Sequence, residues 1–180
     1  RLEEFVRQCD VIVHLAGLNR HNDPQEIYNI NLRLIRRLIE AFEKTGSKPH
    51  VLFSSSIQEE RDNVFGKSKR EGRLMLAEWA ERSGAIFTGM VIPNVFGPFG
   101  NPYYNSVVAT FAHQLTHYKE PKIEVDADLR MIYIGDLVKE IHDCIQRKVN
   151  NTEYRVAHTN EAKVTEILEL LKSFKSHYFE

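Results

Sequence analysis

The sequence predicts an α/β protein built on a doubly wound parallel sheet, and two observations support this prediction. Short apolar segments that stop at small residues alternate with longer segments in which apolar residues recur every three or four positions. The short segments are nearly continuous in apolar character, as expected of strands buried on both faces of a parallel sheet. Strands that alternate with helices in this order form crossover units, so we expect this fold class.

Three segments are predicted strands: residues 11–16, 51–53 and 85–92. Ligands of such sheets bind beyond the carboxyl ends of the strands. The residues found there are small, hydroxylated or fixed by proline and glycine, which suits close approach of a flat ligand to the backbone. They are segments 16–19, 54–56 and 93–98. Each segment alone matches ordinary turn chemistry, and the three together favour a binding site.

Two helices are predicted between these strands. The apolar residues of segment 27–42 share one helix face, and Gly46 is placed to end that helix. The second helix covers residues 64–82 and carries the small residues Ser68 and Gly72 within its apolar stripe. We expect these two residues to let another helix approach closely.

Two further helices are predicted in the second half of the chain. Asp136 is expected to cap the first of them, with Val138 among its buried residues. Thr165 is expected to cap the second, with Phe174 on its buried face.

The composition excludes several classes of protein. The 180 residues carry a formal net charge of −1, which argues against a dedicated nucleic-acid binder or a binder of anionic membranes. No apolar run approaches the about 20 residues that span a bilayer. Cys9 and Cys144 are the two cysteines and form no CxxC motif, so neither a disulfide framework nor a thiolate zinc site is expected. We expect a cytoplasmic protein.

The start of the chain also carries information. It begins at Arg1, with neither Met nor a signal-peptide pattern, and continues directly into residues that match the middle of a helix. We therefore expect a fragment of a longer protein.

Four motifs point to a known family. They are the His-Leu-Ala-Gly ending of segment 11–17, the Ser-Ser-Ser string at 54–56, an aromatic-Gly-x-Ser-Lys turn at 65–69, and Asn-Val-Phe-Gly-Pro at 94–98. Together they resemble the extended short-chain dehydrogenase/reductases that act on sugar nucleotides. The strings at 13–20, 52–58 and 104–111 resemble more narrowly the N-terminal reductase domain of capsular-polysaccharide enzymes that make UDP-N-acetyl-L-talosamine.

This resemblance implies a Rossmann-like fold whose first βαβ elements are missing from the chain, with residues 1–180 forming one partial domain. Residues 1–100 would be mainly the nucleotide-binding core, and residues 101–180 mainly substrate-side segments. The implied cofactor is NADP or NAD, and the implied substrate is a UDP-linked N-acetylated deoxy sugar of bacterial surface-polysaccharide synthesis. A homodimer built on helices 27–45 and 64–82 is implied, as is a metal-binding cupin domain after the reductase domain. Neither nucleic acid nor a membrane is an expected partner.

The resemblance also assigns roles to individual residues. Ser56 would be the catalytic hydroxyl and Lys69 the catalytic lysine, while Phe65 occupies the place of the family's catalytic tyrosine. Cofactor binding is implied for Leu15, Ala16, Gly17, Ser54, Ser55, Lys69, Pro93 and Val95. Substrate binding is implied for Asn94, Asn105 and Arg130, and no metal site is implied.

Phe65 is the first departure from the family pattern. The tyrosine hydroxyl exchanges a proton with the sugar oxygen while hydride moves, and the nearby lysine lowers its pKa. Phe65 keeps the shape without the proton, so the domain is either an enzyme limited at this step or a silent domain for dimerisation or sugar-nucleotide binding. Phe65 could equally be a core residue of its helix, and Tyr103 or Tyr104 could substitute if the fold brings one within reach.

The second departure is that no glycine-rich phosphate turn occurs in the sequence. Such a turn offers backbone N–H groups at a helix N-terminus to the cofactor's pyrophosphate. We therefore expect the chain by itself to bind NAD(P)H weakly or not at all.

Two rival interpretations remain open. His113 and His117 are four residues apart on a predicted helix, a spacing that could hold two metal ligands, although a solvated histidine pair is favoured. An unrelated α/β binding module is the least favoured alternative for the whole chain.

Overall fold

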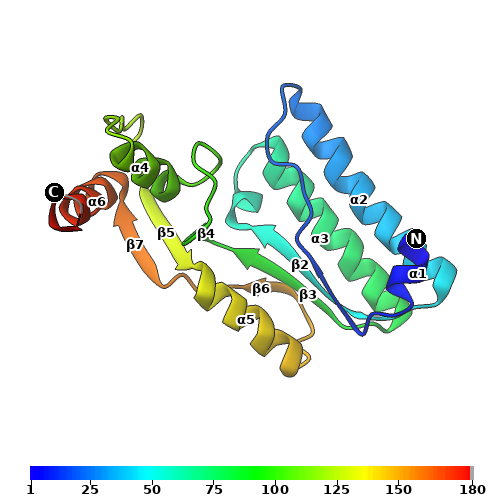
Figure 1. Ribbon diagram of the computed structural model, residues 1–180. Coiled ribbons are helices and arrows are strands. Elements are labelled where there is room, and N and C mark those ends of the chain that lie inside the picture. Colours follow the sequence, from blue (N-terminus) through cyan, green and yellow to red (C-terminus); the bar gives the residue numbers. More distant parts are fainter. Residues whose placement is uncertain (179–180) are drawn as a thin grey trace. The chain divides into compact units, whose positions relative to one another are not determined.

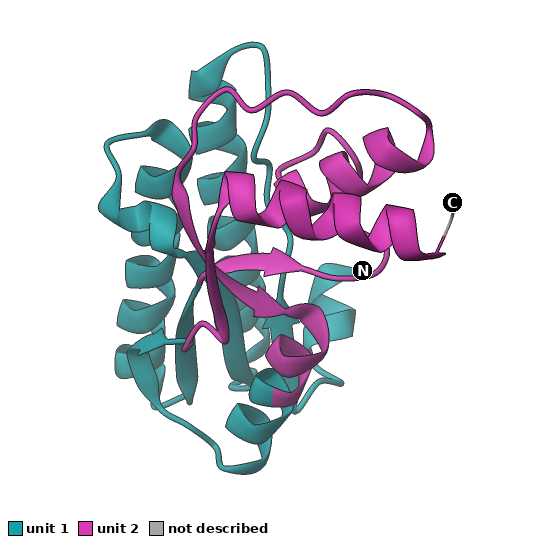
Figure 2. Cartoon of the chain, turned by 90° about the vertical axis from the view of Figure 1, so that its left-hand side faces the viewer, with its two compact units in different colours: residues 1–92, 140–156 teal, residues 93–139, 157–180 magenta. Residues whose placement is uncertain are grey.

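The computed structural model describes residues 1–178, in which helices alternate with strands as predicted (Figure 1). The chain forms two compact units (Figure 2). Unit 1 contains residues 1–92 and 140–156, and unit 2 contains residues 93–139 and the chain from Ala157 onward. The α/β class with a parallel central sheet is confirmed. The division of roles between cofactor and substrate stays a prediction.

The sheet of unit 1 has four parallel strands in the order β1-β2-β3-β6. They are β1 (Val11–His14), β2 (His50–Ser56), β3 (Phe87–Ile92) and β6 (Asn151–Arg155). The strand β2 is longer than predicted, because all three serines of segment 54–56 continue to pair with β3. Its neighbour β3 is buried along its whole length, as its continuous apolar character predicts.

The helices of unit 1 are set by clear start and stop signals. They are α1 (Leu2–Val6), α2 (Pro24–Thr45), the 3₁₀ helix η1 (Ile57–Glu60) and α3 (Val64–Ser83). Asp23 caps α2 by accepting a hydrogen bond from the Gln25 amide. Gly46 and Gly84 end α2 and α3 in the left-handed conformation, with φ of 67° and 72°. The two long helices lie side by side over the sheet (Figure 1).

The small residues of α3 pack inside the chain. Ser68 accepts a hydrogen bond from Asn31 of α2 at 2.9 Å. A Cβ at Gly72 would stand 3.2 Å from Cγ1 of Ile35 in α2 and 3.4 Å from the Phe53 ring. The close approach that these residues permit is therefore between α3 and α2 of one chain, so these residues face α2 and not a second chain.

Unit 2 has a three-stranded sheet in the order β4-β5-β7, with β4 parallel and β7 antiparallel to β5. Its strands are β4 (Asn94–Phe96), β5 (Asp128–Tyr133) and β7 (Asn160–Lys163), and its helices are α4 (Val107–Thr116) and α6 (Val164–Tyr178). A small core of Phe111, Leu115, Val164 and Leu168 joins the two helices. The helix α5 (Ile134–Gln146) begins in unit 2 and ends in unit 1.

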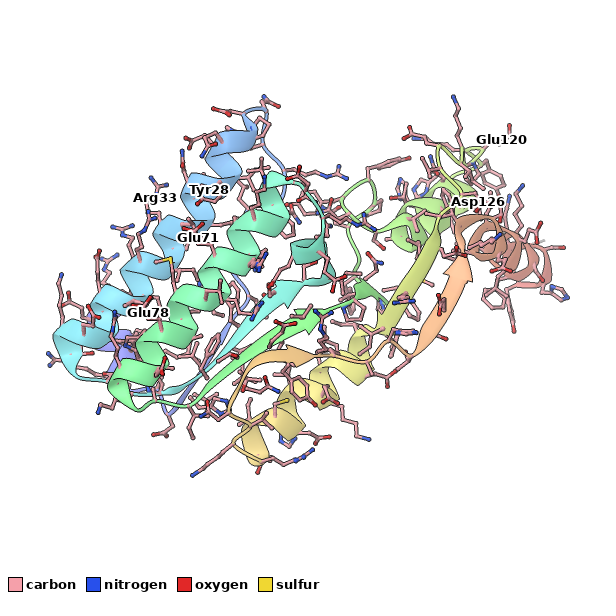
Figure 3. The ribbon with its side chains drawn as sticks, turned by 180° about the vertical axis from the view of Figure 1, so that it is seen from behind. Tyr28, Arg33, Glu71, Glu78, Glu120 and Asp126 are labelled. Atoms are coloured by element: carbon pink, nitrogen blue, oxygen red, sulfur yellow. The ribbon has the colours of Figure 1, made fainter. Side chains whose placement is uncertain are left out.

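Two predicted caps are displaced. The helix α5 starts at Ile134, so Asp136 lies in its first turn. The helix α6 starts at Val164, and Thr165 donates its amide and hydroxyl to the carboxylate of Asp126, which Figure 3 labels. Val138 and Phe174 were predicted to be buried, and this prediction was wrong, because they are 58% and 47% exposed. Among the described residues, no helix combines the length and apolar character that a membrane crossing requires.

Candidate active site

The carboxyl ends of β1, β2 and β3 meet at one edge of the sheet in unit 1. His14 at the end of β1 lies opposite Phe53, and Ser56 at the end of β2 lies opposite Ile92. The Ser54 hydroxyl donates a hydrogen bond to the His14 carbonyl at 3.2 Å, which ties the two strand ends together. Pro93 follows Ile92 directly in the chain. The predicted ligand segments after β1 and β2 therefore share an edge.

A close contact brings the start of α3 to the same edge. Asn63 caps α3 by accepting a hydrogen bond from the Gly66 amide at 2.7 Å. A Cβ at Gly66 would stand 2.0 Å from the carbonyl oxygen of Gln58 in η1, so only glycine fits there. Ser56 begins η1, where its hydroxyl accepts a hydrogen bond from the Gln58 amide at 3.2 Å. The helix that carries Lys69 and the predicted catalytic serine are thus held on adjoining elements.

Lys69 is buried, with 6% of its surface exposed. Its Nζ lies 4.4 Å from the centroid of the Phe53 ring, a cation–π contact. A Cβ at Gly17 would stand 3.7 Å from the same Nζ, so the amine is directed to the loop after β1. Burial lowers the pKa of Lys69 to about 8, against the charge of Glu59, which raises it.

His14 is the second perturbed group at this edge. Its ring packs against Phe53 with the centroids 5.5 Å apart. Burial, and after it the charge of Lys69, lower the pKa of His14 to about 4. The imidazole is therefore neutral at pH 7 and adds no positive charge beside the lysine.

Asn31 is a site residue that the sequence analysis missed. It is buried on α2, and its side chain forms two hydrogen bonds with Leu18 in the loop after β1. Oδ1 of Asn31 accepts a hydrogen bond from the Leu18 amide at 2.6 Å, and Nδ2 donates one to the Leu18 carbonyl at 2.9 Å. The same Nδ2 bonds Ser68 of α3. An amide within an otherwise apolar helix face was the signal that could have revealed it.

The three predicted serines have different surroundings. Ser55 is buried, and its hydroxyl donates to the carboxylate of Glu59. Ser54 bonds the His14 carbonyl, as described above. Ser56 is half-buried and caps η1, and its catalytic role stays a prediction. Leu15, Ala16 and Gly17 are exposed, so this edge is open to solvent.

Phe65 lies in the first turn of α3 and is half-buried. The tyrosines of unit 1 are engaged elsewhere: Tyr28 donates its hydroxyl to Glu71, and Tyr154 donates to Glu140. Tyr103 and Tyr104 belong to unit 2, where the Tyr103 ring packs edge-on to His113 at 5.6 Å. Substitution by Tyr103 or Tyr104 stays a prediction.

The predicted substrate residues all lie in unit 2. Asn94 donates its side-chain amide to the Arg130 carbonyl at 3.1 Å, which joins β4 to β5. The Arg130 guanidinium is exposed and lies 3.6 Å from the Glu161 carboxylate. Val95 is partly exposed, and Asn105 has a φ of 58°. The structure thus brings Asn94 and Arg130 together.

The rings of His113, in α4, and His117, which caps the end of α4, lie against each other in a tilted arrangement. The His113 and His117 rings are 3.9 Å apart, and Nδ1 of His117 lies 2.8 Å from the His113 carbonyl oxygen. Within residues 1–178, no group of three or more His, Cys, Asp or Glu side chains could hold a metal ion.

Comparison with known proteins decides the family. The model of the NAD dependent epimerase/dehydratase family matches residues 1–157. The chain belongs to this family. Membership excludes the unrelated binding module, and it agrees with the parallel sheet and with the packing of α3, which carries Lys69, against η1, which Ser56 caps.

Individual proteins are also similar to this chain. The chain is 35% identical over 179 residues to a UDP-2-acetamido-2,6-beta-L-arabino-hexul-4-ose reductase of Pseudomonas aeruginosa, with 97% of this chain and 48% of that protein covered. It is 30% identical to the capsular polysaccharide assembling protein CapF of Staphylococcus aureus, with a TM-score of 0.81 over 99% of this chain and 48% of CapF. The Bordetella bronchiseptica enzyme WbmF in complex with NADH shares the fold, with 16% identity and a TM-score of 0.82 over 98% of this chain and 61% of WbmF. The chain spans about half the length of the curated relative.

Proposed function

We propose that the protein carrying this chain is an NAD(P)-dependent reductase or epimerase that acts on a UDP-linked N-acetylated deoxy sugar in bacterial surface-polysaccharide synthesis. The observation that carries this proposal is the packing of Gly66 on Gln58, which holds Ser56 and the helix of Lys69 on adjoining elements at one sheet edge. The hexul-4-ose reductase and CapF, at 35% and 30% identity, support the substrate class and the pathway.

The residues present fit the nicotinamide end of NAD or NADP. Gly17 has no side chain in front of the Lys69 amine, and Leu15 and Ala16 beside it are exposed, so a flat group can approach there. Lys69, with the loop after β1, would hold this end. A place near the nicotinamide for Pro93 and Val95 is implied by the family resemblance alone. When bound, the reduced cofactor supplies a hydride. The glycine-rich turn for the pyrophosphate is not among these 180 residues.

Reduction of a keto sugar adds a hydride to the carbonyl carbon and a proton to its oxygen. In this proposal the Ser56 hydroxyl donates a hydrogen bond to that oxygen and orients it. The Lys69 ammonium, which has a pKa of about 8, stabilises the negative charge that develops there. Phe65 contributes shape and no proton, so the proton comes from the Lys69 ammonium, which regains one from solvent, and its delivery is the slow part of the reaction.

A second candidate function is a catalytically silent domain that binds the sugar nucleotide or dimerises. The single observation that favours it is Phe65 at the position where this family's chemistry needs a hydroxyl. In either case we propose a homodimer through α2 and α3, and a further C-terminal cupin domain in the full-length protein.

Calorimetric titration of NADH and NADPH into the full-length protein and into the 180-residue chain tests cofactor binding. We expect binding by the full-length protein and none or weak binding by the short chain; micromolar binding by the short chain would contradict this. Turnover is then followed as loss of NAD(P)H absorbance with a UDP-linked 4-keto sugar. Cofactor and sugar binding without turnover would establish the silent domain instead.

A further inference from the structure

A buried ion pair joins η1 to α3, the two elements next to the candidate site. The Arg73 side chain of α3 and the Glu59 side chain of η1 are 5% and 6% exposed. Arg73 donates two hydrogen bonds to the Glu59 carboxylate, from Nη2 at 2.7 Å and from Nε at 3.0 Å. The Ser55 hydroxyl donates to the same carboxylate, so Glu59 links α3 to the end of β2. Such bidentate pairing fixes orientation as well as distance.

The surrounding backbone is shaped to accommodate the arginine. Nη1 of Arg73 donates to the carbonyl of Thr152 at 2.7 Å, at the point where the pairing of β3 with β6 shifts register. A Cβ at Gly89 would stand 2.7 Å from Cδ of Arg73 and 2.4 Å from the Thr152 carbonyl oxygen. Only glycine leaves room for the arginine stem at that place. Glu153 adds a weaker contact at 3.4 Å.

We infer that Glu59, held by Arg73 and Ser55, is a positioning residue of the candidate site. It fixes η1 against α3, and because Arg73 lies one helical turn after Lys69, it places a buried carboxylate on the side of α3 that these two residues share. The catalytic reading of this inference rests on the proposed function. The geometric basis is that Ser56 opens η1, that Glu59 lies within η1, and that Gly66 of α3 packs on Gln58 between them.

The electrostatic part follows from the groups that surround Lys69. Glu59 from η1 raises the pKa of Lys69, burial lowers it, and His14 from β1 is neutral at pH 7 because its own pKa is about 4. Removal of the Glu59 charge should therefore lower the pKa of Lys69 further below about 8.

This part is tested without cofactor or substrate. Lysines of the full-length protein are acetylated with limiting acetic anhydride across pH 6–11, and the modified peptides are quantified by mass spectrometry. We expect Glu59→Gln to move the midpoint of Lys69 acetylation to lower pH. Glu60→Gln is the matched control, because Glu60 is the exposed neighbour that pairs with Arg155. Exposed Lys67 serves as the internal reference for the reagent. An unchanged Lys69 midpoint in Glu59→Gln overturns the electrostatic role.

The geometric part is tested by separating stability from turnover. Replacement of both charged partners by apolar residues, in Glu59→Leu with Arg73→Met, removes the link without stranding a buried charge. We expect a folded protein whose kcat is about ten- to a hundredfold lower, with a smaller change in KM. A folded double variant with the parent kcat overturns the positioning role. If the parent protein itself shows no turnover, the proposed function fails, and the acetylation result still decides the inference.

Discussion

Phe65 occupies the position at which the family has its proton-donating tyrosine, so its surroundings bear on whether the candidate active site can work. It lies in the first turn of α3, one helical turn before Lys69, and it is only half-buried. A core residue that simply fills space would be buried as Leu76 and Trp79 are further along the same helix. The partial exposure of Phe65 therefore favours a position that faces the site.

The first prediction is that Phe65→Tyr raises turnover of the full-length protein. The new hydroxyl would stand one turn from an ammonium that favours its ionised form, and general acid–base catalysis contributes roughly 10²–10⁴-fold. We expect part of that gain in kcat with little change in KM, because the interaction acts mainly in the transition state. The assay is steady-state NAD(P)H oxidation.

A purely structural role for Phe65 would give a different result. A hydroxyl without a partner in a packed position costs about 1–3 kcal/mol of stability. An unchanged kcat with a lower melting temperature in Phe65→Tyr would therefore remove this residue from the site.

The second prediction concerns His14 and acid stability. Its pKa is about 4 in the folded chain and 6.5 in the reference state, so the unfolded chain binds the proton more readily in that window. The free energy of unfolding should fall as pH drops from 6.5 towards 4, by an amount on the order of 2 kcal/mol. Urea unfolding across this range in the parent and in His14→Phe measures it.

The His14→Phe variant should lose this part of the pH dependence, because phenylalanine keeps the ring contact with Phe53 and cannot take up a proton. His21, which is exposed in the loop that follows β1, supplies the matched control. If His21→Phe flattens the curve and His14→Phe does not, burial of His14 is not the cause of the slope.

At the scale of elements, the loop after β1 depends on α2, the helix that follows it in the chain. Asn31 of α2 forms both hydrogen bonds that a strand partner would give to Leu18, and it bonds Ser68 as well. At Leu18, the loop that carries Gly17 is therefore held by the Asn31 side chain rather than by regular sheet pairing.

The third prediction is that Asn31→Leu releases this loop. The amide and carbonyl of half-buried Leu18 lose their partner, while the Ser68 hydroxyl loses one donor and keeps its bond to the Phe65 carbonyl. A buried polar group left unsatisfied costs about 1–3 kcal/mol. We expect a lower melting temperature and faster hydrogen exchange in the peptide around residues 17–19. Asn29→Leu, on the exposed side of the same helix, should leave exchange there unchanged. Equal protection in Asn31→Leu and the parent would contradict the clamp.

The elements that could be predicted from the sequence are those with strong apolar patterns. The three strands of unit 1 that are apolar were found, because burial on both faces leaves a continuous signal in each. The strands β6 and β7 were missed, because most of their residues are exposed and polar. Their positions are set by pairing with strands far away in the sequence, which no local pattern reveals.

The same limit applies to the site. Ser56 and Lys69 are predicted as site residues through the family's motifs, and the structure adds that they lie on adjoining elements. Glu59 and Arg73 could not, because a charged residue on a helix is most often solvent-exposed, and only the fold shows that these two meet in the interior. Ser55 was predicted to bind cofactor, and its hydroxyl proves to be engaged by Glu59.

At the scale of the whole molecule, the proposed homodimer needs a surface on α2 and α3 that is not used within the chain. Ser68 and Gly72 are excluded, because both face inward. The outward row of α3 contains the exposed residues Leu74 and Glu78, and before them the half-buried Glu71. The Glu71 carboxylate is already engaged within the chain by the Tyr28 hydroxyl of α2, and Figure 3 shows these two side chains pointing toward each other. Leu74 is 50% exposed in this row, an apolar residue between two carboxylates.

The last prediction is that Leu74→Asp shifts the full-length protein from dimer to monomer. In a two-fold interface the same residue is buried twice, and burial of a leucine contributes about 1.5–3 kcal/mol. An aspartate there would add a third carboxylate to the row and face its own copy. Light scattering at several concentrations measures the mass. Leu170, 54% exposed on α6, is the matched control, and Leu170→Asp should leave the mass unchanged. A parent protein that is monomeric at all concentrations would contradict the homodimer. A Leu74→Asp variant that stays dimeric would place the dimer interface on another surface.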